Sequence, residues 1–175
     1  IIKTNTVVIK DVNDDEVIEI INHMKNFKSE IRFIEYMDVG ESNKWDPSKV
    51  VSSESLLESI NEHYSLKQMK TETSSTAKKW HIKDSNSSIG LISSITQPFC
   101  SSCNRARLSV DGKLFTCLFA SNGFDIKSVI RSDDYEEKLL EFFKKIWMER
   151  SDQYSQIRFS SKRDLPKVEM SYIGG

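Results

Sequence analysis

The sequence predicts an α/β fold, because a strand, an amphipathic helix and a second strand follow one another within the first 37 residues. β-Branched and apolar residues form a buried strand candidate at 4–9, and residues 31–37 form the second. Such a βαβ unit has two parallel strands. The helix between them is expected to be capped by Asp14 or Asp15 and to bury an apolar face made of Val17, Ile18, Ile21 and Met24.

Further elements follow along the chain. Helices are expected at 53–64 and 134–148, and short strands at 79–83, 89–93, 105–109 and 113–119. Val110-Asp111-Gly112 forms the expected tight turn between the last two strands, since Asp-Gly is a favoured hairpin pair. The apolar stripe expected to be buried on the later helix is Leu139, Phe143, Ile146 and Trp147.

The composition of the chain argues against some classes of function. The chain has 175 residues, with 25 Lys and Arg against 26 Asp and Glu, a net charge of −1. A dedicated nucleic-acid binder usually carries a basic excess, so we expect no nucleic-acid partner. No apolar run reaches the length of about 18 residues that a membrane span needs, and the first residues do not resemble a signal peptide. Because the chain opens within a strand, we expect it to be part of something longer.

Three cysteines carry the most specific pattern. Cys100, Cys103 and Cys117 are spaced C-x2-C-x13-C, and the expected hairpin returns the third cysteine towards the first two. An odd count confined to one segment favours reduced thiols over a disulfide framework. Three interpretations stay open: buried structural thiols, a zinc site with His81 as the fourth ligand, and an iron–sulfur cluster with one open iron.

Two arginines beside these cysteines favour the cluster. Arg105 and Arg107 alternate on the expected strand and would project to one face next to Cys103. Guanidinium groups bind phosphate in a planar, bidentate manner, so a nucleotide triphosphate between the metal and the arginines is the functional interpretation. The alternative is a solvated charged strand face.

The segment from Phe99 to Phe119 resembles the C-terminal cluster motif of the MoaA family, the GTP 3′,8-cyclases of molybdenum cofactor biosynthesis. Residues 32–40, which read Arg-Phe-Ile-Glu-Tyr-Met-Asp-Val-Gly, and the closing Gly174-Gly175 also resemble that family. The resemblance covers essentially the whole chain.

The resemblance implies a lyase of the radical S-adenosylmethionine (SAM) class with two [4Fe–4S] clusters. One cluster, held by a C-x3-C-x2-C motif, cleaves SAM, and the other binds GTP. The product, 3′,8-cyclo-7,8-dihydro-GTP, passes to the partner MoaC, the cyclic pyranopterin monophosphate synthase. The family's fold is an incomplete TIM barrel followed by an α+β cluster domain. This chain has no C-x3-C-x2-C motif, so it resembles the C-terminal half and is expected to be inactive alone.

The resemblance also assigns residues. It implies that Cys100, Cys103 and Cys117 hold the C-terminal cluster, and that the double-Gly tail threads towards the active site. It implies a SAM contact for Met37, which is expected at the carboxyl end of the second strand, where ligands of parallel sheets gather. Lys3 and the run Arg105, Ala106 and Arg107 would bind GTP, with Arg32 as a further candidate.

The expected domains are residues 1–45, with the remaining barrel strands, and 46–175, with the cluster and GTP. We expect a cytoplasmic location, and a homodimer is left open.

Overall fold

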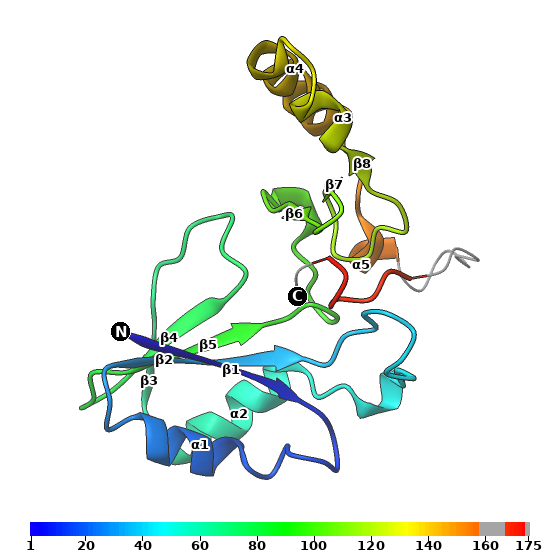
Figure 1. Cartoon of the computed structure of the whole chain (residues 1–175). Helices are drawn as coiled ribbons and strands as arrows, with labels where there is room; N and C mark the ends of the chain where they lie inside the picture. The colour runs from blue at the N-terminus through cyan, green and yellow to red at the C-terminus, as the bar shows by residue number, and fades with distance from the viewer. Residues whose placement is uncertain (158–166, 174–175) are drawn as a thin grey trace. The chain divides into compact units, whose positions relative to one another are not determined.

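The computed structural model describes residues 1–157 and 167–173 (Figure 1). The chain divides into two compact units. The first comprises Ile1–Met37 and Asp46–Ser102, and the second comprises Asp38–Trp45 and Cys103–Gly175. The division into domains at residue 45 stays a prediction.

The first unit contains a five-stranded mixed sheet in the order β1-β2-β5-β4-β3. Strands β1 (Ile2–Val8) and β2 (Ser29–Glu35) are parallel, and helix α1 (Val17–Met24) connects them, which confirms the βαβ unit. Strand β5 (Ser88–Ile92) continues the parallel part beside β2. The remaining two strands are antiparallel to their neighbours: β4 (Lys78–Ile82) and β3 (Leu66–Gln68). The α/β class is therefore confirmed, and the sheet is mixed.

Both α-helices of the first unit cover the same face of its sheet (Figure 1). Helix α2 (Ser53–His63) follows the short 3-10 turn η1 (Pro47–Lys49), and Ser52 caps it by accepting a hydrogen bond from the Ser55 backbone N–H at 3.1 Å. Successive residues of a strand point to opposite faces, so alternate residues of β2 enter the core. The fully buried side chains between sheet and helices include Val8, Ile21, Ile31, Phe33, Ile60 and Ile89.

The expected cap of α1 is wrong. Glu16 precedes the helix and its side chain makes no capping hydrogen bond. Asp14 instead accepts a hydrogen bond from the Asp11 backbone N–H at 2.8 Å, so its carboxylate stabilises the preceding turn. Local competition of this kind is common for Asp in loops.

The second unit contains a three-stranded antiparallel sheet in the order β6-β7-β8. Strands β6 (Arg107–Leu108) and β7 (Lys113–Phe115) are shorter than the sequence predicts, and β8 (Phe124–Asp125) was not predicted. The expected Asp-Gly turn joins β6 and β7. Gly112 adopts a φ of +82°, which favours glycine, and its N–H donates to the Ser109 carbonyl at 3.0 Å.

The helices of the second unit are α3 (Lys127–Ile130), α4 (Tyr135–Met148) and α5 (Tyr154–Ile157). The expected buried stripe on α4 is partly wrong, because Phe143 and Trp147 are 38% and 41% exposed and only Ile146 is buried. The helix pairs with the short α3, which covers little of its surface. In the described parts of the chain no helix is long and apolar enough to cross a bilayer.

The last described residues are anchored within the second unit. The Tyr172 hydroxyl donates to the Asp111 carboxylate at 2.7 Å, and its ring meets Phe115 edge-on at 6.3 Å between centroids. Ile173 is fully buried. The tail up to Ile173 is therefore tied to the β6–β7 hairpin, whereas Gly174 and Gly175 lie outside the described residues.

Replacing Phe33 by Ala should lower the free energy of unfolding by about 3–5 kcal/mol, because it leaves a cavity in the core between sheet and helices. Val12→Ala, at a side chain that is 65% exposed, should change it by less than about 0.5 kcal/mol. Urea denaturation measures both values, and equal losses would contradict this account of the core.

Asp111 should report the tail contact through its pKa. Hydrogen bonds from Ser109 and Tyr172 lower the pKa of Asp111 from 3.8 to about 2. The carboxylate's contribution to stability is therefore present above pH 3.8 and is lost as the pH falls towards 2. Tyr172→Phe should raise the pKa in an NMR titration, and Ser109→Ala should raise it further. An unchanged pKa in Tyr172→Phe would show that the tail contact does not form in solution.

Candidate functional site

Charged side chains lie on the face of the first unit's sheet that α1 and α2 do not cover. Glu30 on β2 is buried and pairs with Arg32 Nε at 2.6 Å and Lys79 Nζ at 3.0 Å. Burial raises the pKa of Glu30, but the hydrogen bonds from Lys79 and Arg32 outweigh it and leave the pKa below its ordinary value. Gly90 on the neighbouring strand leaves room for Arg32, since a Cβ there would lie 3.2 Å from Arg32 Cγ. Arg32 is thus fixed over the sheet by a buried partner.

The structure places two of the expected ligand contacts at opposite ends of the sheet. Lys3 is exposed on β1 and pairs in register with Glu30, near the amino end of β2. Met37 is half-buried and follows β2 at its carboxyl end. At about 3.3 Å per residue, the part of β2 from Glu30 to Glu35 is about 17 Å long, and Met37 lies beyond its end. Lys3 and Met37 are therefore not brought together within this unit.

A buried carboxylate organises the carboxyl edge of the same sheet. Glu35, the last residue of β2, is fully buried. Its Oε1 accepts from the Ser53 backbone N–H at 2.8 Å and from the Thr96 hydroxyl, and its Oε2 accepts from the backbone N–H groups of Ile95 and Thr96, both at 2.8 Å. Glu35 therefore joins β2 to the first turn of α2 and to the loop that follows β5.

Cys100 lies beyond that loop. It opens the 3-10 turn η2 (Cys100–Ser102) at the end of the first unit and is half-buried. Cys100 and Met37 thus both follow the carboxyl ends of neighbouring parallel strands, β5 and β2.

Cys103 begins the main segment of the second unit and is bound to two arginines. Arg105 donates to Cys103 Sγ at 3.1 Å, and Arg150 donates to the Cys103 carbonyl at 2.6 Å. Burial raises the pKa of the Cys103 thiol, but hydrogen bonds to Arg150 and Arg105 outweigh it, so the pKa is lowered. The guanidinium of Arg150 also stacks on Trp147, 4.8 Å from the ring centroid. The sequence pattern did not predict a role for Arg150. This residue follows the end of α4 and lies 47 positions after Cys103 in the sequence.

The expected alternation of Arg105 and Arg107 on one strand is wrong. Only Arg107 lies in β6, while Arg105 precedes the strand and turns back to the Cys103 sulfur. Ala106 between them is exposed. The strand begins late because its partner β7 ends at Phe115, which pairs with Arg107. Cys117 follows β7 by two residues, and its Sγ lies 3.5 Å from the backbone N–H of Phe119.

The second unit has a buried carboxylate of its own. Asp38, 2% exposed, accepts from the Tyr154 hydroxyl at 2.8 Å and from Lys167 Nζ at 3.0 Å. Burial and the Asp38 hydrogen bond raise the pKa of Tyr154. The Tyr154 ring stacks on Phe119, with 4.7 Å between centroids. This cluster therefore ties segment 38–45 to α5 and to the neighbourhood of Cys117.

The tail holds the same segment at a second point. The Glu169 carboxylate accepts from the backbone N–H groups of Glu41 and Ser42, at 2.8 and 3.1 Å. Gly40, with a φ of +70°, makes room for it, because a Cβ at this position would clash with the Glu169 carboxylate. The sequence gives no local signal for these contacts, which join residues more than a hundred positions apart.

The donor chemistry of the cysteines fits a thiophilic metal. All three are thiols outside any disulfide. Within residues 1–157 and 167–173, no three His, Cys, Asp or Glu side chains form a group that could hold a metal ion. The N–H groups of Arg105 and Phe119 nevertheless point at the sulfurs of Cys103 and Cys117. Such hydrogen bonds stabilise thiolates and tune thiolate-bound clusters, so the donor set suits iron–sulfur chemistry. His81, the candidate zinc ligand, is exposed in the middle of β4.

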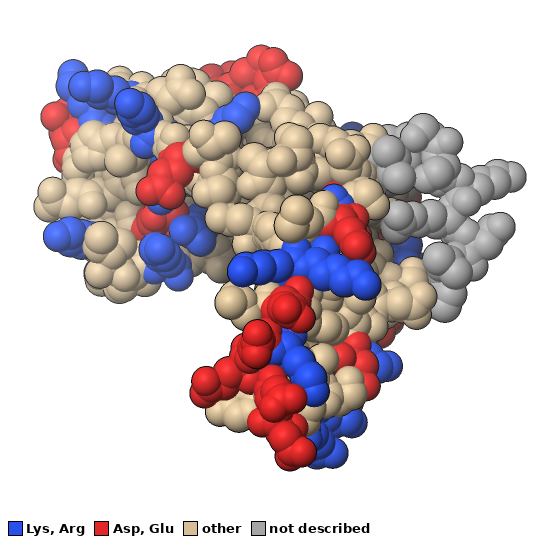
Figure 2. Space-filling view, turned by 90° about the horizontal axis from the view of Figure 1, so that it is seen from above, with Lys and Arg blue, Asp and Glu red and all other residues tan. Residues whose placement is uncertain are grey.

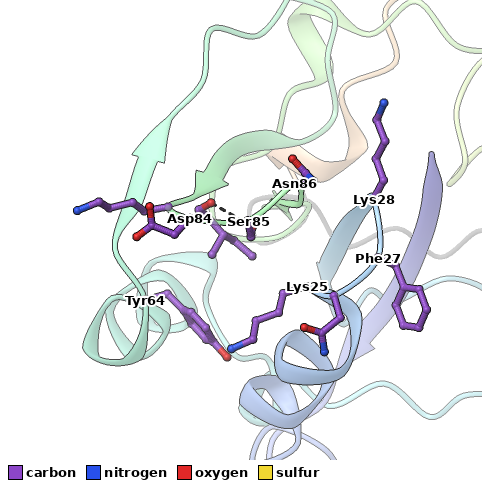
Figure 3. A pocket seen from close by; sticks show the side chains of 10 residues that line it. Lys25, Phe27, Lys28, Tyr64, Asp84, Ser85 and Asn86 are labelled. Carbon is purple, nitrogen blue, oxygen red and sulfur yellow. Dashed lines mark hydrogen bonds between the residues drawn. The ribbon is translucent and has the colours of Figure 1, made fainter.

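A separate pocket of about 450 Å³ lies at the amino edge of the first unit's sheet (Figure 3). It is lined by the ends of α1 and α2 and by the turn between β4 and β5. Lys25 extends over the Tyr64 ring, 5.1 Å from its centroid, whereas Lys28 and Phe27 point away from it (Figure 3). The side chains of Lys25 and Lys28 therefore do not converge in this pocket. None of the site residues predicted from the sequence lines the pocket.

Charges of both signs occur on one face of the molecule. Lys and Arg side chains are interleaved with Asp and Glu on the face shown in Figure 2. This agrees with the near balance of 25 basic and 26 acidic residues.

Comparison with known proteins identifies the family. The model of the protein family described as "Molybdenum Cofactor Synthesis C" matches residues 29–156. Proteins named GTP 3′,8-cyclase from Staphylococcus aureus strains JH9, Newman and USA300 are each 44% identical to this chain over 179 residues. The match covers 99% of this chain and 53% of each relative, so the chain spans about half the length of these curated relatives. The chain belongs to the molybdenum cofactor synthesis C family and corresponds to the C-terminal part of a MoaA-type protein.

Proposed function

We propose that this chain is the part of a GTP 3′,8-cyclase that holds a [4Fe–4S] cluster and GTP. The observation that carries the proposal is the pair of arginines on Cys103: Arg105 on its sulfur and Arg150 on its carbonyl. A cluster bound by only three thiolates, from Cys100, Cys103 and Cys117, supplies an iron that can accept a ligand atom from a substrate. The name of the relatives, GTP 3′,8-cyclase, indicates that GTP is the substrate.

The residues of this chain would act by binding and orienting the nucleotide. Arg105 and Arg107 are the groups proposed for the triphosphate, because guanidinium forks match phosphate oxygens. The Arg105 guanidinium already lies at a sulfur, so it can keep one N–H on the thiolate while others face a ligand. Ala106 offers its backbone and no bulk. Lys3 remains proposed for the same anion in the whole protein, and Met37 for SAM.

The activity itself is proposed only for the whole protein. The chain's three cysteines all belong to the one motif, so these residues offer no thiolates for a cluster that cleaves SAM. We therefore infer that the second [4Fe–4S] cluster, which cleaves SAM, is held by cysteines outside these 175 residues, and that this chain alone binds GTP without converting it. MoaC as the enzyme that takes the product, a cytoplasmic location and a homodimer remain parts of the proposal.

Anaerobic reconstitution with iron and sulfide should give about four irons per chain. Cys100→Ala, Cys103→Ala and Cys117→Ala should each lose most of this iron, because each removes one of three proposed ligands. His81→Ala is the control and should retain the iron. Iron and zinc analysis by mass spectrometry measures the outcome. A chain that holds one zinc and no iron, and loses it in His81→Ala, would be a zinc-stabilised binding module.

Arg105→Ala and Arg107→Ala should each weaken GTP binding by about ten- to hundredfold, the range for a lost charge-assisted hydrogen bond. Arg131→Ala, which removes an exposed arginine at the end of α3, is the matched control and should bind GTP as the parent chain does. Isothermal titration calorimetry under anaerobic conditions gives the dissociation constants. If all three variants bind GTP equally, Arg105 and Arg107 are not part of the nucleotide site.

A further inference from the structure

Glu35 has no role in the proposed chemistry, yet it is a fully buried carboxylate with four hydrogen-bond donors around it. Burying a charge is costly unless hydrogen bonds compensate it. Three of the donors are backbone N–H groups, so the carboxylate fixes main-chain positions and not only side chains. Two of these N–H groups, those of Ile95 and Thr96, belong to the loop between β5 and Cys100.

The connection from this loop to Cys100 is short and stiff. Only Gln97, Pro98 and Phe99 separate Thr96 from Cys100. Gln97 is held by its N–H on the Ser93 carbonyl at 3.3 Å and by its side-chain oxygen, which accepts from Lys78. Proline fixes its own φ and restricts the residue before it to extended conformations. A displacement of Thr96 should therefore also displace Cys100.

The other two cysteines have supports of their own. Arg105 and Arg150 hold Cys103, and the backbone of Phe119 lies at the sulfur of Cys117. None of these contacts involves Glu35 or the 93–99 loop. Loss of the Glu35 hydrogen bonds should therefore affect Cys100 selectively.

From these contacts we infer that Glu35 is a positioning residue that sets the place of the Cys100 thiol as a cluster ligand. The inference rests on the proposed function for the identity of the cluster. The anchoring of the Cys100 loop by Glu35 is independent of that identity and can be measured on the thiol itself. A role limited to overall stability would affect the three thiols alike.

The test compares Glu35→Gln with the parent chain. Gln keeps the shape but replaces one accepting oxygen by an NH₂ group, which faces donors and cannot accept from them. In cluster-free protein, well below the melting temperature, alkylation followed by mass spectrometry gives the rate at each cysteine. We expect the alkylation rate at Cys100 to rise about tenfold, because the loss of a hydrogen bond of this kind makes local opening of the loop easier. The rates at Cys103 and Cys117 should change little. Glu58→Gln, on the exposed face of α2, is the control.

A second arm measures iron per chain and the electron paramagnetic resonance spectrum after anaerobic reconstitution. Glu35→Gln should load less iron, or give an altered spectrum, while Glu58→Gln matches the parent. If the parent chain takes up no iron, the proposed function fails, whereas the alkylation arm still decides whether Glu35 anchors Cys100.

Thr96→Val covers the case in which Glu35→Gln does not fold. It removes only the hydroxyl donor to Glu35 and leaves the backbone hydrogen bonds intact. It should raise the Cys100 rate by a smaller factor. Unchanged Cys100 reactivity in the folded variants, or an equal rise at all three cysteines, would overturn the inference.

Discussion

The hydrogen bonds around the buried Glu35 carboxylate are the constraint on which the carboxyl edge of the first unit depends. An uncompensated charge in this position would be strongly destabilising, so the first turn of α2 and the loop after β5 must both supply donors to the Glu35 carboxylate at the end of β2. The ends of two parallel strands are thereby held in a fixed relation. It is at such ends that parallel sheets present ligand-binding residues. Met37 and Cys100 follow these two strands, β2 and β5.

The second unit uses polar contacts in the same way. Asp38 is buried beneath Tyr154 and Lys167, and Glu169 binds the backbone beside Gly40. Arg150 returns from the end of α4 to the Cys103 carbonyl. These contacts link segments that are distant in the sequence, and the Arg150 contact holds the backbone of Cys103 directly. Such preorganisation suits a site that must hold a reactive, oxygen-sensitive group in one geometry.

Local sequence patterns predicted the elements whose stability is local. The βαβ unit followed from β-branched runs and helical spacing, and the turn at Gly112 from the backbone freedom of glycine. The strands β3 and β8 were missed because two or three residues show no alternating pattern, whereas the equally short β6 and β7 were marked by the Asp-Gly turn between them. The exposure of Trp147 could not be predicted, since periodicity shows that a helix has an apolar side but not which neighbour covers it.

The candidate site was predictable to a similar extent. The cysteine spacing pointed to a metal centre, but Arg150 and Tyr154 gave no signal because their partners are far away in the sequence. Glu35, by contrast, has a local signal in the sequence. It follows Ile31 and Phe33 at alternate positions, so the period of the strand places a carboxylate on the buried face. A charged residue at an apolar position is a sign of a buried polar anchor.

The central claim is that this chain holds an iron–sulfur cluster with one iron open to GTP. Mössbauer spectroscopy of the iron-loaded chain, with and without GTP, tests it most directly. The account predicts that GTP changes the signal of about one iron in four, because only one lacks a cysteine ligand. Spectra that are identical with and without GTP, or that show every iron bound by cysteine, would contradict it.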